Sequence, residues 1–200
     1  MIAIIDYGMG NLGSVRKALT YLGYEAVITD SPSLALSASG LILPGVGAMA
    51  HAMESLKAKN MDQVVFDYTS TGRPFLGICL GMQMLFDSTE EGDGTVKGLG
   101  LLPGRVLKFS PEQGLKIPQI GWNSLTAVSH PALREDDFVY FVHSYYCAPD
   151  RLEDIAATTL YGIEYASAVA RDNILATQFH PEKSGEVGLS ILNRWARSTR

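Results

Sequence analysis

The sequence predicts an α/β fold, in which a mostly parallel central sheet flanked by helices carries an antiparallel extension in the C-terminal half. Up to Ile78, strand-like and helix-like segments alternate, and this alternation is typical of a parallel sheet with helices on both faces. After Gly92, short strand-like runs follow one another instead, the last of them separated only by turns. Because 46% of the 200 residues are apolar, we expect a single domain, residues 1–200, with a core of ordinary size.

The first half of the chain supplies the predicted parallel strands and their helices. Ile2–Ile5 is a continuous apolar run, as expected of a strand that is buried on both faces. In Asn11–Leu22 the apolar residues recur at helical spacing, and Gly23 ends the helix. The remaining segments are strands at Ala26–Thr29, Leu41–Leu43 and Phe75–Ile78, and a helical stretch, Ala48–Ser70, that is broken near Asn60.

The second half supplies the predicted antiparallel extension and a closing helix. We expect the final helix, Glu186–Arg197, to bury Leu189, Leu192 and Trp195 or a neighbouring stripe. The strand-like runs contain many β-branched and aromatic residues, as strands do. These runs are Arg105–Phe109, Phe138–Val142, Ile155–Leu160, Tyr165–Ala170 and Ile174–Phe179.

Composition and charge argue against several functional classes. A net charge of −5 with 18% charged residues leaves no basic surface for nucleic acid. No apolar run approaches the roughly 20 residues of a membrane span, and the N-terminus is too short and too soon acidic for a signal peptide. Since Cys79 and Cys147 do not make a disulfide framework, we expect a soluble protein of the reducing cytoplasm that binds no membrane.

The most informative motif is Gly77-Ile78-Cys79-Leu80-Gly81, the thiol version of a nucleophile elbow, in which a strand turns sharply into a helix. A Cβ atom at either outer glycine would collide with the turn or with substrate. The helix expected to follow, from Leu80 to Phe86, would direct its dipole and free N–H groups at the sulfur and favour the thiolate. Taken alone, a buried structural cysteine between packing glycines explains the same pattern.

A thiol nucleophile requires a base, and His180-Pro181-Glu182 supplies one together with a carboxylate. Pro181 holds His180 in an extended conformation, in which residues two apart project to the same side. Glu182 is therefore placed to fix the tautomer of His180 and to stabilise its protonated form. A strand-end histidine in a turn is the structural alternative.

The other histidines are weaker candidates for the base. His51 lies in a helical stretch and His130 in a loop, and neither has a carboxylate at a useful spacing. His143 heads the run His143-Ser144-Tyr145-Tyr146 at a strand end, where it is a plausible lining residue. Since the chain has neither a Cys-x-x-Cys motif nor a helical His pair, we expect no metal site and no cofactor.

A glycine-rich loop, Pro44-Gly45-Val46-Gly47, follows a predicted strand and is a candidate oxyanion site. Backbone N–H groups freed by such a turn, together with the N–H of Leu80, would face a developing negative charge. One donor of this kind is worth roughly 10²–10³ in rate. An ordinary strand-to-helix turn is the alternative.

A second glycine-rich segment, Gly8-Met9-Gly10-Asn11-Leu12-Gly13, matches the fingerprint of dinucleotide-binding folds, and Asp30 ends the next strand. Against a nicotinamide cofactor, Asp6 and Tyr7 stand where that fingerprint continues apolar. A dehydrogenase would also leave Cys79 and His180 without a role. Nicotinamide binding therefore stays only as an alternative.

Together, these motifs resemble the class I, or triad, glutamine amidotransferases. Gly-x-Cys-x-Gly and His-Pro-Glu are the two signatures of that superfamily, and they occur here in the expected order. Within it, the chain is similar over essentially its whole length to the glutaminase subunits of imidazole glycerol phosphate synthase. The further segments that carry this resemblance are Asp6-Tyr7-Gly8-Met9-Gly10-Asn11, Leu43-Pro44-Gly45-Val46-Gly47, Met82-Gln83, Gly121-Trp122-Asn123, His143-Ser144-Tyr145 and His180-Pro181-Glu182-Lys183-Ser184.

The resemblance implies the flavodoxin-like class I amidotransferase fold and a triad of Cys79, His180 and Glu182. Cys79 would attack the side-chain amide of glutamine, and backbone N–H groups of Val46 and Leu80 would hold the oxyanion. His180 would protonate the departing ammonia and then activate water to hydrolyse the thioester. The residues implied in glutamine binding are Gly45, Gly47, Gln83, Glu91, His143, Ser144 and Tyr145.

The resemblance also implies a partner, a (β/α)₈ cyclase subunit that forms a heterodimer with this chain and receives its ammonia. The products would be imidazole glycerol phosphate and aminoimidazole carboxamide ribotide, in histidine biosynthesis. Asn11, Trp122 and Lys183 are candidate interface residues, although a helix cap, a core aromatic and a surface cation explain them equally simply. The glutaminase of another synthase, of the anthranilate or pyridoxal-phosphate type, stays open as an alternative.

Overall fold

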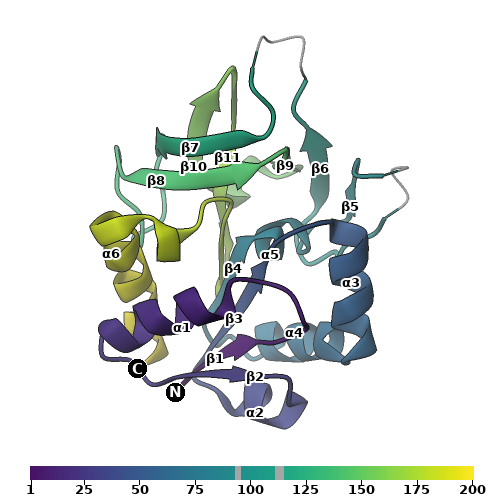
Figure 1. The fold of residues 1–200 in the computed structure, drawn as a ribbon, viewed down its shortest axis with the longest axis vertical. Coiled ribbons are helices and arrows are strands. Elements are labelled where there is room, and N and C mark those ends of the chain that lie inside the picture. Colours follow the sequence, from purple (N-terminus) through teal and green to yellow (C-terminus); the bar gives the residue numbers. More distant parts are fainter. Residues whose placement is uncertain (93–95, 111–114) are drawn as a thin grey trace.

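The fold is built on a 10-stranded mixed sheet, seen in a computed structural model that describes residues 1–92, 96–110 and 115–200 (Figure 1). In spatial order the sheet runs β2 (Ala26–Thr29), β1 (Ile2–Ile5), β3 (Gly40–Gly45), β4 (Phe75–Cys79), β12 (Ile174–Thr177), β11 (Ile163–Arg171), β9 (Tyr145–Pro149), β6 (Gly104–Lys108) and β5 (Ser88–Thr89). Off this path, β10 (Ile155–Tyr161) pairs with β11. A separate two-stranded ribbon consists of β7 (Gln119–Ser124) and β8 (Phe138–His143).

Six α-helices of the described residues accompany these strands: α1 (Leu12–Tyr21), α2 (Pro32–Ser37), α3 (Met49–Ala58), α4 (Met61–Ser70), α5 (Leu80–Gln83) and α6 (Gly185–Ala196). The predicted break of the long helical stretch is confirmed, because Asn60 adopts a left-handed conformation with φ of 56° between α3 and α4. The short helix α2 was not predicted. It begins with Pro32 after Ser31, whose side chain accepts a hydrogen bond from the Leu34 N–H.

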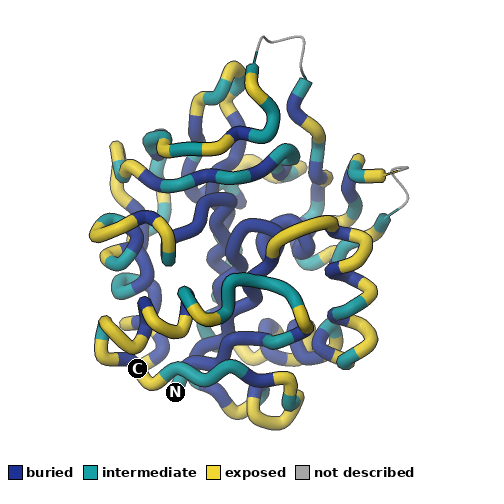
Figure 2. The backbone as a smooth tube through the Cα atoms, in the orientation of Figure 1, coloured by how far each residue is buried: buried dark blue, intermediate teal, exposed yellow. Residues whose placement is uncertain are grey.

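Two hydrophobic cores lie on opposite faces of the sheet, and β1 contributes to both. Ala3 and Ile5 pack in the cluster that includes residues of α2, α3 and α4, whereas Ile2 and Ile4 pack in the cluster that includes residues of α1 and α6. Successive side chains of a strand point to opposite faces, so a strand covered on both sides is apolar throughout. Figure 2 shows the resulting buried strands at the centre of the molecule. The predicted α/β class is therefore confirmed.

The parallel and antiparallel parts of the sheet meet at β12. The neighbouring strands β2, β1, β3, β4 and β12 all run parallel. On its other side β12 pairs antiparallel with β11, which pairs antiparallel with β9, and β9 in turn with β6. The run that begins at Ile174 therefore belongs to the parallel core as well as to the antiparallel extension.

The assignment of Phe138–Val142 to the antiparallel extension is wrong. This run forms β8, which pairs only with β7 as far as the described residues go, in a ribbon that crosses in front of β10 and β11 in the upper part of Figure 1. Its alternation of buried and exposed residues predicts a strand with one covered face but does not identify the strand it pairs with. Strand β7 itself was not predicted, and neither were β5 and β9. No helix among the described residues is long and apolar enough to cross a membrane.

Candidate active site

Cys79 ends β4 in a strained conformation, and α5 begins at the next residue. Its φ of 55° and ψ of −110° are unusual for a residue with a side chain, as expected at a nucleophile elbow. The neighbouring strand β3 explains Gly81, the second glycine of the elbow. A Cβ atom on Gly81 would lie 1.9 Å from the Leu43 carbonyl oxygen, and one on Gly45 would lie 2.8 Å from the Leu80 Cβ. Close packing of the elbow against β3, rather than access for substrate, therefore requires glycine here.

The expected helix from Leu80 to Phe86 is wrong, because α5 ends at Gln83. The carbonyl groups that would continue it are bound by another segment: Leu99 N–H donates to the Met84 carbonyl at 2.7 Å, and Gly100 N–H to the Phe86 carbonyl at 3.1 Å. A helix of one turn has only a small dipole. Any stabilisation of the sulfur must therefore come from individual donors, such as the N–H of Leu80, which has no intrahelical acceptor at this position.

His180 and Glu182 form a buried pair next to the elbow. The His180 Nδ1 atom lies 2.8 Å from Glu182 Oε1, and the two side chains are only 2% and 1% exposed. Strand β12 is the parallel neighbour of β4, with Thr177 opposite Ile78, so His180 emerges at the same sheet edge as Cys79. The carboxyl ends of neighbouring parallel strands are where α/β sheets place their sites. The predicted grouping of the base, its carboxylate and the elbow at one place is thus observed.

The charge of His180 is set by opposing effects. Burial lowers its pKa, but the interactions with Cys79 and Glu182 raise it more, to about 9. The imidazole is therefore protonated at neutral pH. Within the described part of the chain, its buried Nε2 atom has no hydrogen-bond partner, and neither has the Oε2 atom of Glu182. The ring nitrogen that is not bound to Glu182 is free to exchange a proton.

A cavity of about 440 Å³ lies over Cys79 and gathers most of the predicted site residues. Two of the lining residues, Pro118 and Val142, were not predicted, and no local signal in the sequence marks them. The predicted residues that line the cavity are Val46, Gly47, Cys79, Leu80, Gln83, Glu91, His143, Ser144, Tyr145, His180 and Lys183.

Four predicted residues lie outside the cavity lining. Gly45 is packed beneath Leu80, and Glu182 lies behind His180. Asn11 directly precedes α1, where its side chain makes no capping hydrogen bond. Trp122 lies on the outer face of the ribbon and is 47% exposed, so it is not a core aromatic residue.

The carbonyl of Tyr145 organises one wall of the cavity. It accepts hydrogen bonds from Gln83 Nε2 at 3.0 Å and from His143 Nδ1 at 2.8 Å. Burial lowers the pKa of His143 to about 4, although the Tyr145 carbonyl opposes this and His180 adds to it. His143 is therefore a neutral lining residue and not a second base.

Gln178 is a site residue that the sequence analysis missed. It is fully buried, and its Nε2 atom lies 3.7 Å from the Cys79 sulfur. Its position was a usable signal, because Gln178 follows directly on β12 and precedes His180 by only two residues. The same spacing, counted forward, had identified Glu182, which lies in the 3₁₀ turn Pro181–Lys183 rather than in an extended segment.

Glu91 has a contact that the sequence did not suggest. Its Oε2 atom accepts a hydrogen bond of 2.6 Å from the N–H of Met49, the first residue of α3. The glycine-rich loop Pro44–Gly47 immediately precedes this helix. A carboxylate at a helix N-terminus stabilises it through the free N–H groups and the dipole. Glu91 therefore ties the wall of the cavity to the end of the candidate oxyanion loop.

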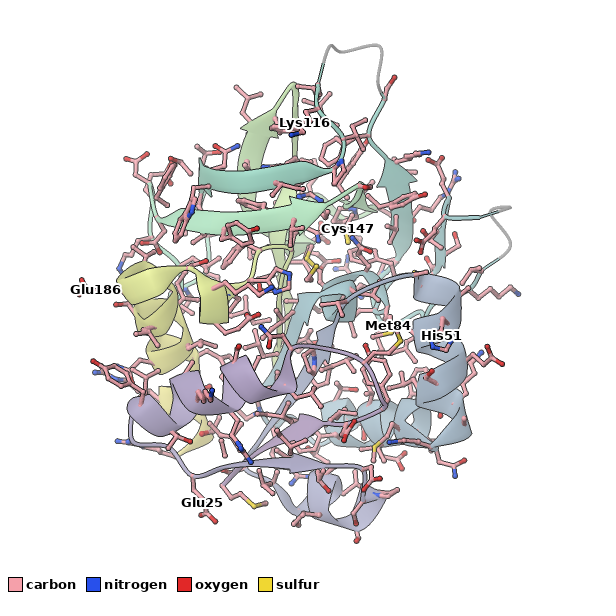
Figure 3. The ribbon with its side chains drawn as sticks, in the orientation of Figure 1. Glu25, His51, Met84, Lys116, Cys147 and Glu186 are labelled. Carbon is pink, nitrogen blue, oxygen red and sulfur yellow. The ribbon has the colours of Figure 1, made fainter. Side chains whose placement is uncertain are left out.

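Other regions offer no comparable chemistry. A larger cavity of about 650 Å³ lies at the amino ends of β4 and β12, where its lining includes His130 but no cysteine. His51 lies on α3, away from the centre of the molecule (Figure 3). Among the described residues, no group of three or more His, Cys, Asp or Glu side chains is arranged to hold a metal ion.

Comparisons with known proteins show the family to which this chain belongs. The profile of the family glutamine amidotransferase class-I matches residues 3–197. Imidazole glycerol phosphate synthase subunit HisH of Syntrophotalea carbinolica is 48% identical over 205 residues, which cover 98% of this chain and 98% of that protein. The chain belongs to the HisH family of class I glutamine amidotransferases.

Two further comparisons place this HisH-family amidotransferase among its relatives. Imidazole glycerol phosphate synthase hisHF, chloroplastic, of Arabidopsis thaliana is 47% identical over 200 residues, which cover 98% of this chain and 34% of that protein. A crystal structure of a glutamine amidotransferase has a TM-score of 0.77 at 17% identity and covers 100% of this chain and 99% of its own. The similarity to this crystal structure shows that the fold is shared.

The family assignment displaces the dinucleotide alternative, and the N-terminal segment of this HisH-family chain has another arrangement. Asp30, which would bind a ribose in a dinucleotide fold, lies 3.6 Å from the Lys59 Nζ atom. The same Nζ atom donates a hydrogen bond of 3.0 Å to the Asp6 carbonyl. Lys59 thus ties the ends of β1 and β2 together at the place where that cofactor would lie.

Proposed function

We propose that this chain is the glutaminase subunit of an imidazole glycerol phosphate synthase and forms one amidotransferase domain. In this proposal Cys79 is the nucleophile, His180 the general acid and base, and Glu182 the carboxylate that orients His180. The observation that carries the proposal is the position of Cys79 at a strained elbow, one strand away from the buried His180–Glu182 pair. The HisH relatives favour this synthase over the anthranilate and pyridoxal-phosphate types.

The first half of the reaction forms a thioester. Because the pKa of His180 is about 9, its imidazole is protonated beside Cys79, which then reacts as the thiolate. The sulfur attacks the side-chain amide carbon of glutamine, and the carbonyl electron pair moves onto the oxygen. The N–H groups of Val46 and Leu80 stabilise this oxyanion. When the C–N bond breaks, His180 gives its proton to the nitrogen, and ammonia leaves a γ-glutamyl thioester on Cys79.

The second half of the reaction restores the enzyme. Neutral His180 takes a proton from water, and the resulting hydroxide attacks the thioester carbonyl in the same oxyanion site. The C–S bond breaks, glutamate leaves, and Cys79 is again a thiolate beside protonated His180. Glu182 accepts a hydrogen bond from His180 Nδ1 throughout and so holds that nitrogen in its donor form.

Glutamine binding is assigned to the polar residues of the cavity. The carboxylate of Glu91 and the amide of Gln83 suit the α-ammonium and amide groups of glutamine. Ser144 and Tyr145 lie beside neutral His143 in the lining of the cavity, and Gly45 and Gly47 leave space for the backbone of the oxyanion loop. These roles follow from position and chemistry.

The proposed partner is a (β/α)₈ cyclase subunit that takes the ammonia before it escapes to water. The Arabidopsis relative, whose name joins the two subunits in one chain, supports this pairing. On the ribbon, Trp122 and Phe138 are 47% and 51% exposed and stack with ring centroids 6.0 Å apart, an apolar surface suited to an interface. Lys183 at the rim of the cavity and Asn11 before α1 complete the proposed contacts. The cyclase would release imidazole glycerol phosphate and aminoimidazole carboxamide ribotide in the cytoplasm, in histidine biosynthesis.

Glutamine hydrolysis by wild-type protein and Cys79→Ala, each with and without the cyclase and its substrate, tests the proposal. We expect activity that depends on the cyclase and is lost in Cys79→Ala, together with co-purification of the cyclase by both proteins. Ser70→Ala, on the surface at the end of α4, is a control for handling. Glutamine hydrolysis retained by Cys79→Ala in the assembled enzyme would show that the mechanism is wrong.

A further inference from the structure

Gln178 is a fully buried polar residue that the proposed mechanism does not use. It lies between β12 and His180 and has 0% exposure. A buried amide is costly unless its donors and acceptor are bonded. Among the described residues, the side chain of Gln178 has two hydrogen bonds, one to Gln83 and one to the sulfur of Cys79.

The directions of the two hydrogen bonds of Gln178 follow from the contact between Gln83 and the Tyr145 carbonyl. The Tyr145 carbonyl can only accept, so the Gln83 atom 3.0 Å from it must be the amide nitrogen. The second N–H of that nitrogen donates to the Gln178 oxygen at 3.0 Å. The Gln178 amide is therefore oriented with its oxygen toward Gln83 and its NH₂ group toward Cys79.

This orientation presents an N–H donor to the sulfur. The Nε2–Sγ distance of 3.7 Å suits a hydrogen bond to sulfur, whose radius is larger than that of oxygen. A donor aimed at a thiolate stabilises the charged form, and bonds to charged acceptors are stronger than bonds to neutral ones. Since α5 is a single turn, its dipole is small. The Gln178 donor therefore supplies the stabilisation of the thiolate that the dipole of a longer helix would have supplied.

We propose that Gln178 is a positioning residue that holds and stabilises the thiolate of Cys79, and that its own orientation is fixed through Gln83 by the Tyr145 carbonyl. The inference rests on the proposed role of Cys79 as the nucleophile. The same hydrogen bonds also limit which group of Gln83 can bind the substrate. Both N–H groups of Gln83 are engaged, so the amide oxygen is the part of Gln83 that is available to accept a hydrogen bond from glutamine.

The test is the pH profile of Cys79 alkylation by iodoacetamide in the full chain, with mass spectrometry to separate Cys79 from the buried Cys147. Gln178→Met keeps the length of the side chain and removes the donor. We expect its alkylation midpoint to move to higher pH, so that the rate below both midpoints falls about tenfold. In the complex with the cyclase, we expect kcat to fall about tenfold, with a much smaller change in KM for glutamine because Tyr145 still holds Gln83.

Gln63→Met is the matched control, because Gln63 is an exposed amide on α4 that donates to Asp67 at 2.8 Å. It carries the same chemical change away from the sulfur, and we expect a wild-type profile. A folded Gln178→Met protein whose alkylation profile coincides with that of wild type would overturn the proposal. Loss of hydrolysis in Cys79→Ala tests the nucleophile separately, so failure of one idea is distinguishable from failure of the other.

A second measurement on wild-type protein does not depend on the stability of the variant. The side-chain NH₂ resonances of Gln178, followed by NMR in protein with ¹⁵N-labelled glutamine residues, should shift as Cys79 titrates. The shift should be absent in Cys79→Ser over the same pH range. Resonances of Gln178 that do not respond to the ionisation of Cys79 would also overturn the proposal.

Discussion

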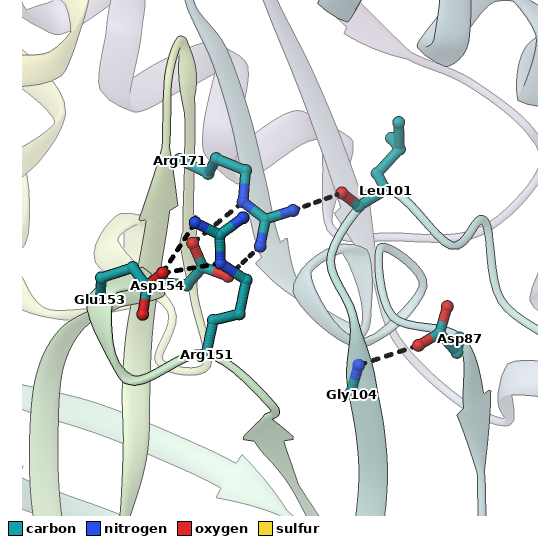
Figure 4. Close-up of polar contacts among 7 residues, drawn as sticks. All are labelled: Asp87, Leu101, Gly104, Arg151, Glu153, Asp154 and Arg171. Carbon is teal, nitrogen blue, oxygen red and sulfur yellow. Dashed lines mark hydrogen bonds and ion pairs between the residues drawn. The ribbon is translucent and has the colours of Figure 1, made fainter.

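Among the described residues, two buried carboxylates have cationic partners, and the two pairs differ in how completely they are bonded. Asp154, in the 3₁₀ turn Leu152–Asp154, is 3% exposed and uses both oxygens to bind the Arg171 guanidinium of β11. Arg171 also donates to the Leu101 carbonyl at 3.3 Å (Figure 4). Glu182 uses one oxygen, on His180, and its second oxygen has no partner among the described residues.

The difference separates a structural pair from the pair that we propose to be catalytic. A buried carboxylate that forms a forked bond with arginine is fully satisfied, and removal of either partner leaves an unpaired charge. The His180–Glu182 pair leaves one ring nitrogen and one carboxylate oxygen without partners, which is costly for folding but keeps the ring able to exchange a proton. Figure 4 also shows the exposed pair of Arg151 and Glu153, and pairs of that kind contribute little.

The largest effect is expected from Glu182→Gln. The amide introduced at position 182 cannot stabilise protonated His180. It also favours the His180 tautomer in which Nδ1 carries no proton. We therefore expect glutamine hydrolysis by the assembled enzyme to fall roughly 10³–10⁴-fold. Thermal unfolding at pH 10, where His180 is neutral, should change little, because the variant removes a carboxylate that was only half bonded. A change mainly in stability, with activity kept, would contradict the distinction between the two pairs.

The opposite pattern is expected for Arg171→Met. This substitution leaves the carboxylate of Asp154 buried without a partner, and we expect unfolding in urea to show a loss of about 3 kcal/mol. Hydrolysis by the folded fraction should stay close to wild type. In the double variant Asp154→Leu with Arg171→Met, no charge is left unpaired, so much of the stability should return. A double variant as unstable as the sum of its single substitutions would show that the charges are not the cause.

The His180–Glu182 pair should also make stability depend on pH. The folded pKa of His180, about 9, lies above its ordinary value of 6.5, so the contribution of His180 to stability is complete below pH 6.5 and is lost as the pH rises through about 9. Between pH 6.5 and pH 9, the free energy of unfolding falls by about 3 kcal/mol through His180. Urea unfolding of wild type and Glu182→Gln between pH 6 and pH 10 isolates the share that Glu182 contributes, because the interaction of His180 with Cys79 and the other titrating groups are common to both. We expect a flatter profile in the variant.

The smallest effect is expected at a third carboxylate, Glu91, which binds a backbone N–H rather than a cation. Glu91→Ala removes the cap of α3, and we expect a loss of about 1 kcal/mol in urea unfolding. Because Glu91 also lines the cavity, KM for glutamine should rise roughly tenfold. The control is Glu90→Ala, since Glu90 accepts from the Lys108 N–H at 3.0 Å and is not part of the lining. Equal KM values for the two variants would remove Glu91 from the proposed binding residues.

Most of the parallel core was predictable because its signals are local. Continuous apolar runs marked β1 and β4, and Asn60 marked the break between α3 and α4. The elbow and the His180–Glu182 pair were also readable, because a glycine-flanked turn and a two-residue spacing constrain geometry within a few residues. The extended conformation expected for this pair is wrong, however, since Glu182 lies in the 3₁₀ turn Pro181–Lys183. The extent of α5 was not predictable, since distant N–H groups at Leu99 and Gly100 bind the carbonyls that would have continued it.

By itself the sequence determined the candidates for the chemistry: a thiol on a tight turn, a histidine with its carboxylate, and two loops rich in glycine. Only the tertiary structure decided how they meet, because strand pairing between segments far apart in the chain is not encoded in any local pattern. The parallel pairing of β12 with β4 places His180 and Gln178 beside Cys79, and the loop around Glu91 reaches the start of α3. These contacts connect distant segments, so their geometry depends on the packing of the whole sheet.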